Sequence, residues 1–184
     1  MDPAVLRDDM VDSLVHPSTG CVESDEIGDA MRTVPRDAFV EDERTAYADR
    51  AFERLGTRVL APSTAGRLLE ALDPNPDDSV LVVGAGVGYT TAVLAEIVGS
   101  RRVQAVDIDR RLVYEARENL SEAGYEAVLV DCRDGADGLP EYAPYDRILI
   151  EAAAVRPPER VLDQLAADGR LVMPLGAATQ SISV

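Results

Sequence analysis

From Ser79 onward, short apolar runs rich in β-branched residues alternate with longer amphipathic stretches, and this alternation limits the chain to one class of fold. Strands without polar alternation are typical of parallel sheets that are buried on both faces. The predicted strands are residues 80–83, 103–107, 127–130, 146–150 and 169–175. The predicted helices are residues 90–98, 110–123 and 158–167, with Gly124 just past the end of the second. The sequence therefore predicts an α/β fold with a doubly wound, mostly parallel sheet.

The part of the chain before the first strand has a different character. It is acidic, and apolar residues recur at helical spacing between Val5 and Val34. Residues 63–72 are typical of a further helix, and we expect Ser63 or Thr64 to cap its first turn. This part is therefore predicted to be helical.

No linker separates the two parts, because residues 73–78 have the length of a turn that leads into the first strand. We therefore expect a single domain over residues 1–184, with an N-terminal, substrate-side segment (1–76) and an α/β core (77–184). One more strand is expected to open at Gln180, just before the sequence stops, so a shortened C-terminal sheet edge is expected.

A glycine-rich loop directly follows the first predicted strand, in the run VLVVGAGVGY. Gly84, Gly86 and Gly88 let the backbone turn tightly and let a ligand approach closely at the carboxyl end of the strand. A dinucleotide fingerprint would place a small residue five positions after the first glycine, where this chain has Tyr89. The loop therefore favours S-adenosylmethionine, which carries no phosphate, although a glycine turn without a ligand stays an alternative.

Two carboxylates follow the next two strands. Asp107 ends the second strand, where an acidic side chain can accept hydrogen bonds from both ribose hydroxyls of a nucleoside. NAD and S-adenosylmethionine share that requirement, and a solvated carboxylate beside Asp109 is the alternative. Asp134, in the loop DCRDGADG, is placed to meet an adenine amino group, with Gly135 leaving the approach open.

The longer motifs carry a resemblance to a known family. They include AMRTVPRDAFV, VGAGVGYTTAVLA and RDGADGLPEYAPYDRILIEAAA, and they follow one another in family order over nearly the whole chain. The matching stretches are residues 30–40, 46–49, 83–95, 116–125, 133–154 and 164–176. In these the chain resembles the protein-L-isoaspartate O-methyltransferase family, a branch of the class I S-adenosylmethionine-dependent methyltransferases.

The resemblance implies methyl transfer from S-adenosyl-L-methionine to the α-carboxylate of isoaspartyl residues in damaged proteins or peptides. The methyl ester then collapses to a succinimide that can reopen to normal aspartate, so the implied function is protein repair. By residue match, Asp107 would hold the ribose of the cofactor and Asp134 its adenine end. The implied cofactor-binding residues are Gly84, Ala85, Gly86, Gly88, Tyr89, Asp107, Asp134 and Gly135.

The sequence departs from the family pattern at three places. Leu60 occupies the position of a serine that helps form the isoaspartyl site, so no catalytic residue is assigned. Val82 replaces an acidic residue, and Glu151 replaces a threonine. Arg58 is a possible new carboxylate partner or a solvent-facing residue. These departures keep two alternatives open: a cofactor-binding homologue without isoaspartyl activity, and a methyltransferase with another carboxylate or small-molecule substrate.

Other chemistries lack the residues they need. The one histidine, His16, precedes the sheet, and Cys21 and Cys132 have no metal-ligand spacing, so we expect no metal site, no disulfide and no hydrolase. A nicotinamide oxidoreductase is the weakest alternative. We also expect a cytoplasmic protein, because no apolar run is long enough to span a membrane and the acidic N-terminus does not resemble a signal peptide.

The charge of the chain is strongly negative. The 34 acidic residues outnumber 18 basic ones, all of them arginine, for a net charge of −16. No basic patch is present, so neither nucleic acid nor a membrane surface is expected as a partner. A lysine-free, aspartate-rich composition resembles that of proteins from halophiles that accumulate salt. The oligomeric state is not readable from the sequence.

Overall fold

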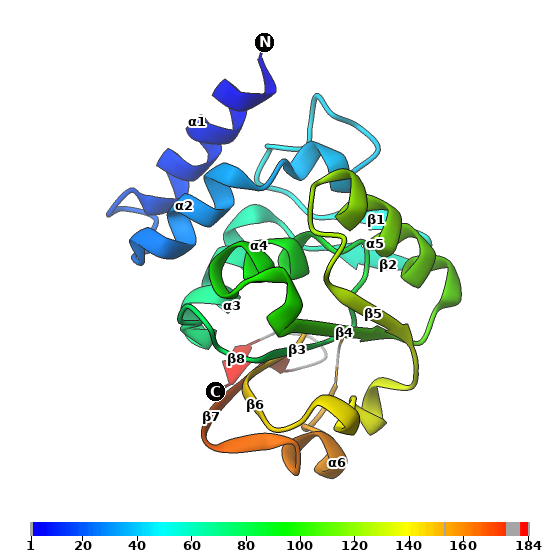
Figure 1. Cartoon of the computed structure of the whole chain (residues 1–184). Helices are drawn as coiled ribbons and strands as arrows, with labels where there is room; N and C mark the ends of the chain where they lie inside the picture. The colour runs from blue at the N-terminus through cyan, green and yellow to red at the C-terminus, as the bar shows by residue number, and fades with distance from the viewer. Residues whose placement is uncertain (1, 153, 176–180, 184) are drawn as a thin grey trace.

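The computed structural model describes residues 2–152, 154–175 and 181–183, and a six-stranded sheet runs through its centre (Figure 1). The strands of this sheet are β3 (Val80–Val83), β4 (Val103–Asp107), β5 (Leu129–Cys132), β6 (Tyr145–Ile150), β7 (Leu165–Leu175) and β8 (Ser181–Ser183). Strands β3 to β7 pair in parallel, and β8 pairs antiparallel with β7. The doubly wound, mostly parallel α/β fold predicted from the sequence is confirmed.

The order of the strands creates a crevice at one edge of the sheet. That order is β5-β4-β3-β6-β7-β8. After β3 the chain moves outward through β4 and β5, and it then returns to β6 on the opposite side of β3. The carboxyl ends of β3, β4 and β6 therefore meet where the winding reverses, which is where open α/β sheets bind their ligands.

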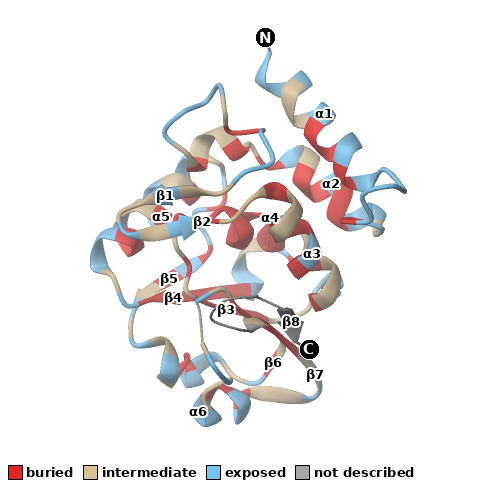
Figure 2. Ribbon diagram, turned by 180° about the vertical axis from the view of Figure 1, so that it is seen from behind, coloured by how far each residue is buried: buried red, intermediate tan, exposed pale blue. Residues whose placement is uncertain are grey.

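Helices cover the two faces of the sheet unequally (Figure 1). The α-helices are α1 (Pro3–Val15), α2 (Asp25–Thr33), α3 (Pro62–Leu72), α4 (Tyr89–Val98), α5 (Arg110–Glu122) and α6 (Glu159–Leu162). The short 3-10 turns are η1 (Arg36–Phe39), η2 (Ser100–Arg102), η3 (Gly135–Asp137) and η4 (Pro140–Tyr142). Val80 and Val82 belong to the larger core cluster, with α3, α4 and α5, whereas Leu81 and Val83 face a smaller one that includes residues of α6. All four residues of β3 are buried, as Figure 2 shows.

The predicted end of the second core helix is confirmed. Gly124 has φ +90°, and its amide donates to the Ser121 carbonyl at 3.1 Å. The amide of Tyr125 donates to the Leu120 carbonyl at 2.7 Å. These two bonds satisfy carbonyls at the end of α5 that have no partner within the helix, and the left-handed backbone suits glycine.

The helix predicted over residues 158–167 is wrong in its second half, because α6 ends at Leu162 and β7 begins at Leu165. The buried Gln164 accepts from the Leu139 amide at 2.9 Å with its Oε1 and donates to the Asp137 carbonyl at 2.8 Å with its Nε2. Its carbonyl accepts from the Tyr145 amide of β6 at 2.8 Å. Sheet pairing and these tertiary bonds override the helical pattern of the sequence.

Two further boundaries differ from the prediction. The strand expected at 127–130 is β5, which begins at Leu129, because the turn after α5 extends to Val128, whose amide donates to the Tyr125 carbonyl at 3.1 Å. The cap expected from Ser63 or Thr64 is also wrong. Pro62 starts α3 instead, and the Asp49 carboxylate accepts from the Ser63 amide at 2.9 Å.

The N-terminal part also contains a hairpin that the sequence analysis does not predict. Strands β1 (Phe52–Arg54) and β2 (Thr57–Val59) pair antiparallel around a turn in which Leu55 and Gly56 both have positive φ. Strands of three residues are too short to show a clear period. At the other end of the chain, the strand expected to open at Gln180 is β8, which begins at Ser181 and pairs with β7, while Gln180 itself lies outside the described residues. The shortened sheet edge stays a prediction.

A buried arginine ties the N-terminal part to the core. Arg36 is fully buried; its Nε donates to the Ala46 carbonyl at 2.8 Å and its Nη2 to the Leu60 carbonyl at 2.7 Å. The guanidinium also stands 4.6 Å from the ring centroid of Tyr89, the first residue of α4. One side chain thereby fixes two loop segments against the helix that follows the glycine-rich loop.

We predict that Arg36→Leu lowers the free energy of unfolding by about 3 kcal/mol, because two carbonyls lose charge-assisted partners in a buried setting. Denaturant unfolding followed by circular dichroism measures the change. The matched control is Arg44→Leu, since the Arg44 side chain is 93% exposed and should contribute less than about 0.5 kcal/mol. Equal losses in the two variants would contradict the role given to Arg36.

Candidate active site

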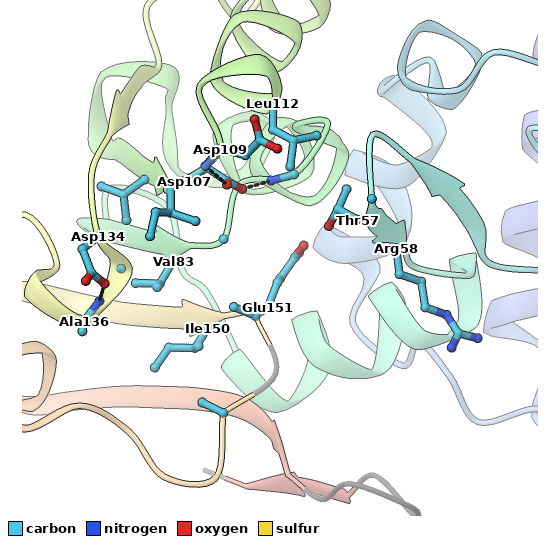
Figure 3. Close-up of a pocket in the computed structure, with 18 of the residues that line it drawn as sticks. Thr57, Arg58, Val83, Asp107, Asp109, Leu112, Asp134, Ala136, Ile150 and Glu151 are labelled. Atoms are coloured by element: carbon cyan, nitrogen blue, oxygen red, sulfur yellow. Dashed lines mark hydrogen bonds between the residues drawn. The ribbon is translucent and has the colours of Figure 1, made fainter.

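A cavity of about 490 Å³ opens at the carboxyl ends of β3, β4 and β6 (Figure 3). Its walls come from the glycine-rich loop after β3, the turn after β4, η3, the residues after β6 and the β1–β2 hairpin. The volume lies in the range of pockets that enclose a small organic ligand. The crevice predicted from the winding of the sheet is therefore a formed cavity.

The three glycines of the loop, Gly84, Gly86 and Gly88, have different structural roles. Gly84 has φ +88°, and a Cβ there would come 3.0 Å from the amide nitrogen of Ala152. Gly86 has φ +55°, and a Cβ there would meet no atom within 4 Å, so its side of the backbone is open to a ligand. Gly88 lies at the start of α4, where a Cβ would come 3.3 Å from Leu120 of α5. Gly88 thus serves packing, whereas Gly84 and Gly86 line the cavity.

Asp107 at the end of β4 is held by two backbone donors. Its Oδ2 accepts from the Gly86 amide at 2.9 Å, and its Oδ1 accepts from the Asp109 amide at 3.0 Å (Figure 3). The residue is 8% exposed and lines the cavity. Each oxygen of a carboxylate can accept more than one hydrogen bond, so both remain able to receive ligand hydroxyls.

The turn after β5 brings Asp134 and Gly135 to the same cavity. Asp134 caps η3, because its Oδ1 accepts from the Ala136 amide at 2.9 Å (Figure 3). A Cβ on Gly135 would come 2.6 Å from the Cγ1 of Val83, so glycine lets this turn sit directly on the end of β3. The two residues that the sequence assigned to the adenine end therefore share a wall with the end of the central strand.

Apolar side chains complete this half of the cavity. Ile108, directly after Asp107, is 72% exposed although it is large and apolar, and Leu112 from the first turns of α5 is buried. Both line the cavity, together with Val83 and Ile150. A flat apolar group can therefore lie beside the carboxylate of Asp107.

Three residues that the sequence assigned to the cofactor do not line this cavity. Ala85, Gly88 and Tyr89 line a much smaller adjoining one of about 20 Å³. The Tyr89 ring packs edge-on against Phe39, with centroids 5.8 Å apart, and is buried beneath Arg36. The structure thus brings together Gly84, Gly86, Asp107, Asp134 and Gly135, and places Tyr89 in the packing behind them.

The opposite wall of the cavity comes from the hairpin and the segment after it. Thr57, Arg58 and Leu60 all line the cavity. Leu60 places an apolar side chain there, while its carbonyl is held by Arg36. Arg58 is exposed, and its guanidinium points away from Glu151 in Figure 3. Of the two alternatives for Arg58, a new carboxylate partner or a solvent-facing residue, the exposed position of its side chain favours the second.

Glu151, which stands out in the sequence only as a departure from the family pattern, lines both the large cavity and the small one. It follows β6, and its amide donates to the Val83 carbonyl at 2.9 Å. Its Oε1 is shielded from solvent and has no hydrogen-bond partner within the part of the chain that the structure describes. Burial raises the pKa of Glu151 to about 7, with a contribution from the charge of Asp107, while Thr90 and Arg36 oppose the shift.

Features of other chemistries are not found here. Within the described ranges, no group of three or more His, Cys, Asp or Glu side chains could hold a metal ion. His16 is exposed at the end of α1, where its Nδ1 lies 2.8 Å from the Ser18 hydroxyl. Nor is any helix in those same ranges both long and apolar enough to cross a membrane.

A comparison with protein-family models identifies the relatives of this chain. Residues 7–184 match the model described as protein-L-isoaspartate(D-aspartate) O-methyltransferase (PCMT). The chain belongs to the PCMT family. The resemblance in residues 30–40 and in the glycine-rich loop is thereby confirmed at the level of the family.

Individual PCMT relatives agree with this assignment. A protein-L-isoaspartate O-methyltransferase from Aeropyrum pernix is 46% identical over 163 residues, which are 86% of this chain and 63% of that protein. One from Roseiflexus is 40% identical over 185 residues, 99% of this chain and 83% of the relative. This chain thus spans less than two thirds of the length of the Aeropyrum protein.

A solved structure shows the same fold. It comes from Plasmodium falciparum, is assigned as a protein-L-isoaspartate O-methyltransferase, and was determined in complex with S-adenosyl-L-homocysteine. It superposes with a TM-score of 0.83 over 96% of this chain and 87% of its own, at 22% identity. At that identity the likeness supports the methyltransferase-like α/β fold of the PCMT family.

We predict that Glu151→Gln stabilises the protein above neutral pH. The folded pKa of about 7 exceeds the ordinary value of 4.5, so the native state binds more protons and wild-type stability falls as pH rises between those values. At about pH 8 the ionised Glu151 lowers the free energy of unfolding by about 3 kcal/mol, and the uncharged amide of glutamine avoids this loss. Denaturant unfolding at about pH 5 and pH 8 measures this, and an equal stability difference between the two proteins at both pH values would refute it.

Proposed function

We propose that this protein transfers a methyl group from S-adenosyl-L-methionine to the α-carboxylate of isoaspartyl residues in damaged proteins. The observation that carries the proposal is the cradle at the switch point, where Gly86 leaves its backbone open and donates its amide to Asp107. Membership of the PCMT family supports the reaction type. The resulting ester would collapse to a succinimide, which can reopen to normal aspartate.

The residues of the cavity fit this cofactor. Asp107 would accept hydrogen bonds from the ribose hydroxyls, because it lines the cavity and both of its oxygens are oriented by backbone amides. Asp134 would meet the adenine amino group, with Ile108 and Leu112 against the ring. The open side of Gly86 allows the close approach of a bulky ligand to the backbone.

The reaction requires little acid–base catalysis from the protein. When bound, S-adenosylmethionine supplies a methyl group on a sulfonium sulfur, which an ionised carboxylate can accept. A carboxylate with a pKa of about 4 is already ionised at neutral pH, so no side chain has to remove a proton. The contribution of this chain is then to align the acceptor and exclude water, for which the hairpin wall and the buried segment around Leu60 are placed.

A second candidate is a cofactor-binding homologue that lacks isoaspartyl activity. It is favoured by Leu60, which gives the hairpin wall an apolar side chain where a hydroxyl would serve a charged substrate. It is also favoured by Glu151, which adds a further carboxylate to the site. Losing a hydrogen bond to a charged group costs about 1.5–3 kcal/mol, which is a ten- to hundredfold weakening rather than a complete loss. We therefore favour a slower enzyme over an inactive homologue.

The surroundings of the protein follow from its charge. We propose a cytoplasm with concentrated salt, because a net charge of −16 without lysine destabilises a compact chain unless its repulsion is screened. Cys21 and Cys132 are free thiols, in keeping with a reducing compartment. The proposed partners are proteins or peptides that carry isoaspartate, and neither nucleic acid nor a membrane is expected.

We predict labelled methyl ester on an isoaspartyl peptide, and none on the same peptide with normal aspartate, after incubation with methyl-labelled cofactor in concentrated KCl. Asp107→Ala should bind S-adenosylhomocysteine ten- to hundredfold more weakly by calorimetry, because the ribose loses a charged acceptor. Glu118→Gln, which changes an exposed glutamate on α5, is the control and should bind normally.

Cofactor binding without any labelled ester would favour the homologue without activity. In that case Leu60→Ser shows whether a hydroxyl on the hairpin wall is what the site lacks, since ester should then form. Unchanged affinity in Asp107→Ala would instead refute the ribose assignment.

We also predict that the melting temperature rises steeply with KCl, from about 0.1 M to above about 1 M, where the Debye length is only about 3 Å. Thermal unfolding followed by circular dichroism measures this. A series at constant low salt with sucrose added separates charge screening from the general exclusion of solutes. A melting temperature that does not change with KCl would contradict the proposal of a salt-rich cytoplasm.

A further inference from the structure

Glu151 lies at the junction of the two adjoining cavities. It lines both the large one and the small one, and so do Gly86, Arg58 and Leu60. In Figure 3 its side chain extends from the end of β6 toward Thr57 on the opposite wall. It therefore stands between the half that would hold the cofactor, around Asp107, and the hairpin wall. An acceptor that reaches the cofactor from the hairpin side has to pass this carboxyl group.

Among the residues that the structure describes, no basic side chain forms an ion pair with Glu151. Arg36, from η1, donates its Nε and Nη2 to the carbonyls of Ala46 and Leu60, and its Nη1 has no partner among the described residues. Its positive charge lowers the pKa of Glu151, but by less than burial and Asp107 raise it. Arg58, from β2, directs its guanidinium away (Figure 3). From β4 comes the charge of Asp107, and from α4 only the neutral hydroxyls of Thr90 and Tyr89. A carboxylate with a solvent-shielded oxygen and no ion pair is costly, so the protonated form of the half-buried Glu151 is favoured here.

An acceptor carboxylate strengthens this preference. Two carboxylates that share one site cannot both stay ionised at low cost, and one of them holds a proton between them. A protonated carboxyl group gains a donor, the O–H, which an ionised one lacks. The hairpin wall beside it offers the apolar side chain of Leu60, so a neutral Glu151 is the group placed to donate to an incoming anion.

We propose that protonated Glu151 donates a hydrogen bond to the acceptor carboxylate, at the oxygen that is not methylated, and thereby makes methyl transfer by this protein fastest below neutral pH. The inference rests on the proposed function. The acceptor oxygen gains the methyl carbon as the carbon–sulfur bond breaks with its electron pair left on sulfur. Glu151 keeps its proton throughout, so no base is needed.

The expected result is a value of kcat/KM that falls with pH around neutrality, a range in which most side chains do not titrate. With a pKa of about 7, the protonated fraction of Glu151 falls about tenfold between pH 6 and pH 8. The value of kcat/KM for the peptide reports groups of the enzyme before the peptide binds, so it should fall about tenfold over the same interval.

The experiment measures S-adenosylhomocysteine formation on an isoaspartyl peptide from about pH 5.5 to pH 8.5 at constant KCl. This product does not decay with the ester, so succinimide formation at higher pH leaves the rate unaffected. Wild type is compared with Glu151→Gln, whose amide donates without titrating, and with Glu118→Gln as an exposed control. We expect kcat/KM to fall about tenfold between pH 6 and pH 8 in wild type and in Glu118→Gln. In Glu151→Gln we expect kcat/KM to be about the same at the two pH values.

The outcomes separate the two proposals. Peptide-dependent product that is absent at every pH in all three proteins refutes the proposed function itself. Product that forms with the same pH profile in wild type and Glu151→Gln overturns the role of Glu151 while the function stands. A wild-type rate that rises with pH, and a rise lost in Glu151→Gln, also overturns it, because an ionised Glu151 would then serve as a base for a neutral acceptor.

Discussion

A single buried guanidinium joins the two parts of this molecule. Arg36 gives its hydrogen bonds to backbone carbonyls, at Ala46 and Leu60, and lies over the ring of Tyr89 at the start of α4. The wall that faces a substrate and the helix that carries the glycine-rich loop are therefore positioned by the same side chain. Because the hydrogen-bond acceptors of Arg36 are main-chain carbonyls, these bonds depend on the path of the backbone more than on the identity of the neighbouring side chains.

The core of the fold is predictable from the sequence because its signals are local. Strand β3 follows from an unbroken apolar run, β4 from a short run that contains two valines, and the end of α5 from Gly124. The elements that were missed depend on distant partners. Gln164 forms side-chain hydrogen bonds with the turn before β6, which ends α6 early. The paired strands of the hairpin are three residues long, too short to show a clear period.

The residues of the site that can be predicted from the sequence are those whose place is set by the backbone at the ends of the strands. Asp107, Gly84 and Gly86 could be placed because a carboxylate and glycines at strand ends have a fixed position in a doubly wound sheet. Tyr89 could not, because whether its ring points to the ligand or to Arg36 is decided by packing from residues fifty positions away in the chain. Glu151 stands out in the sequence only as a departure from the family pattern, and its place at the junction of two cavities, with a shielded Oε1, is seen only in the structure.

The contact between Gly84 and Ala152 has an evolutionary consequence. A Cβ at position 84 would press on the backbone that follows β6, and the amide of Glu151 is bonded to the end of β3. The loop that would receive one ligand and the residue that would meet the other thus share a common piece of main chain. Mutations on the two sides should show epistasis, so lineages that alter their acceptor specificity are expected to change both segments together rather than one at a time.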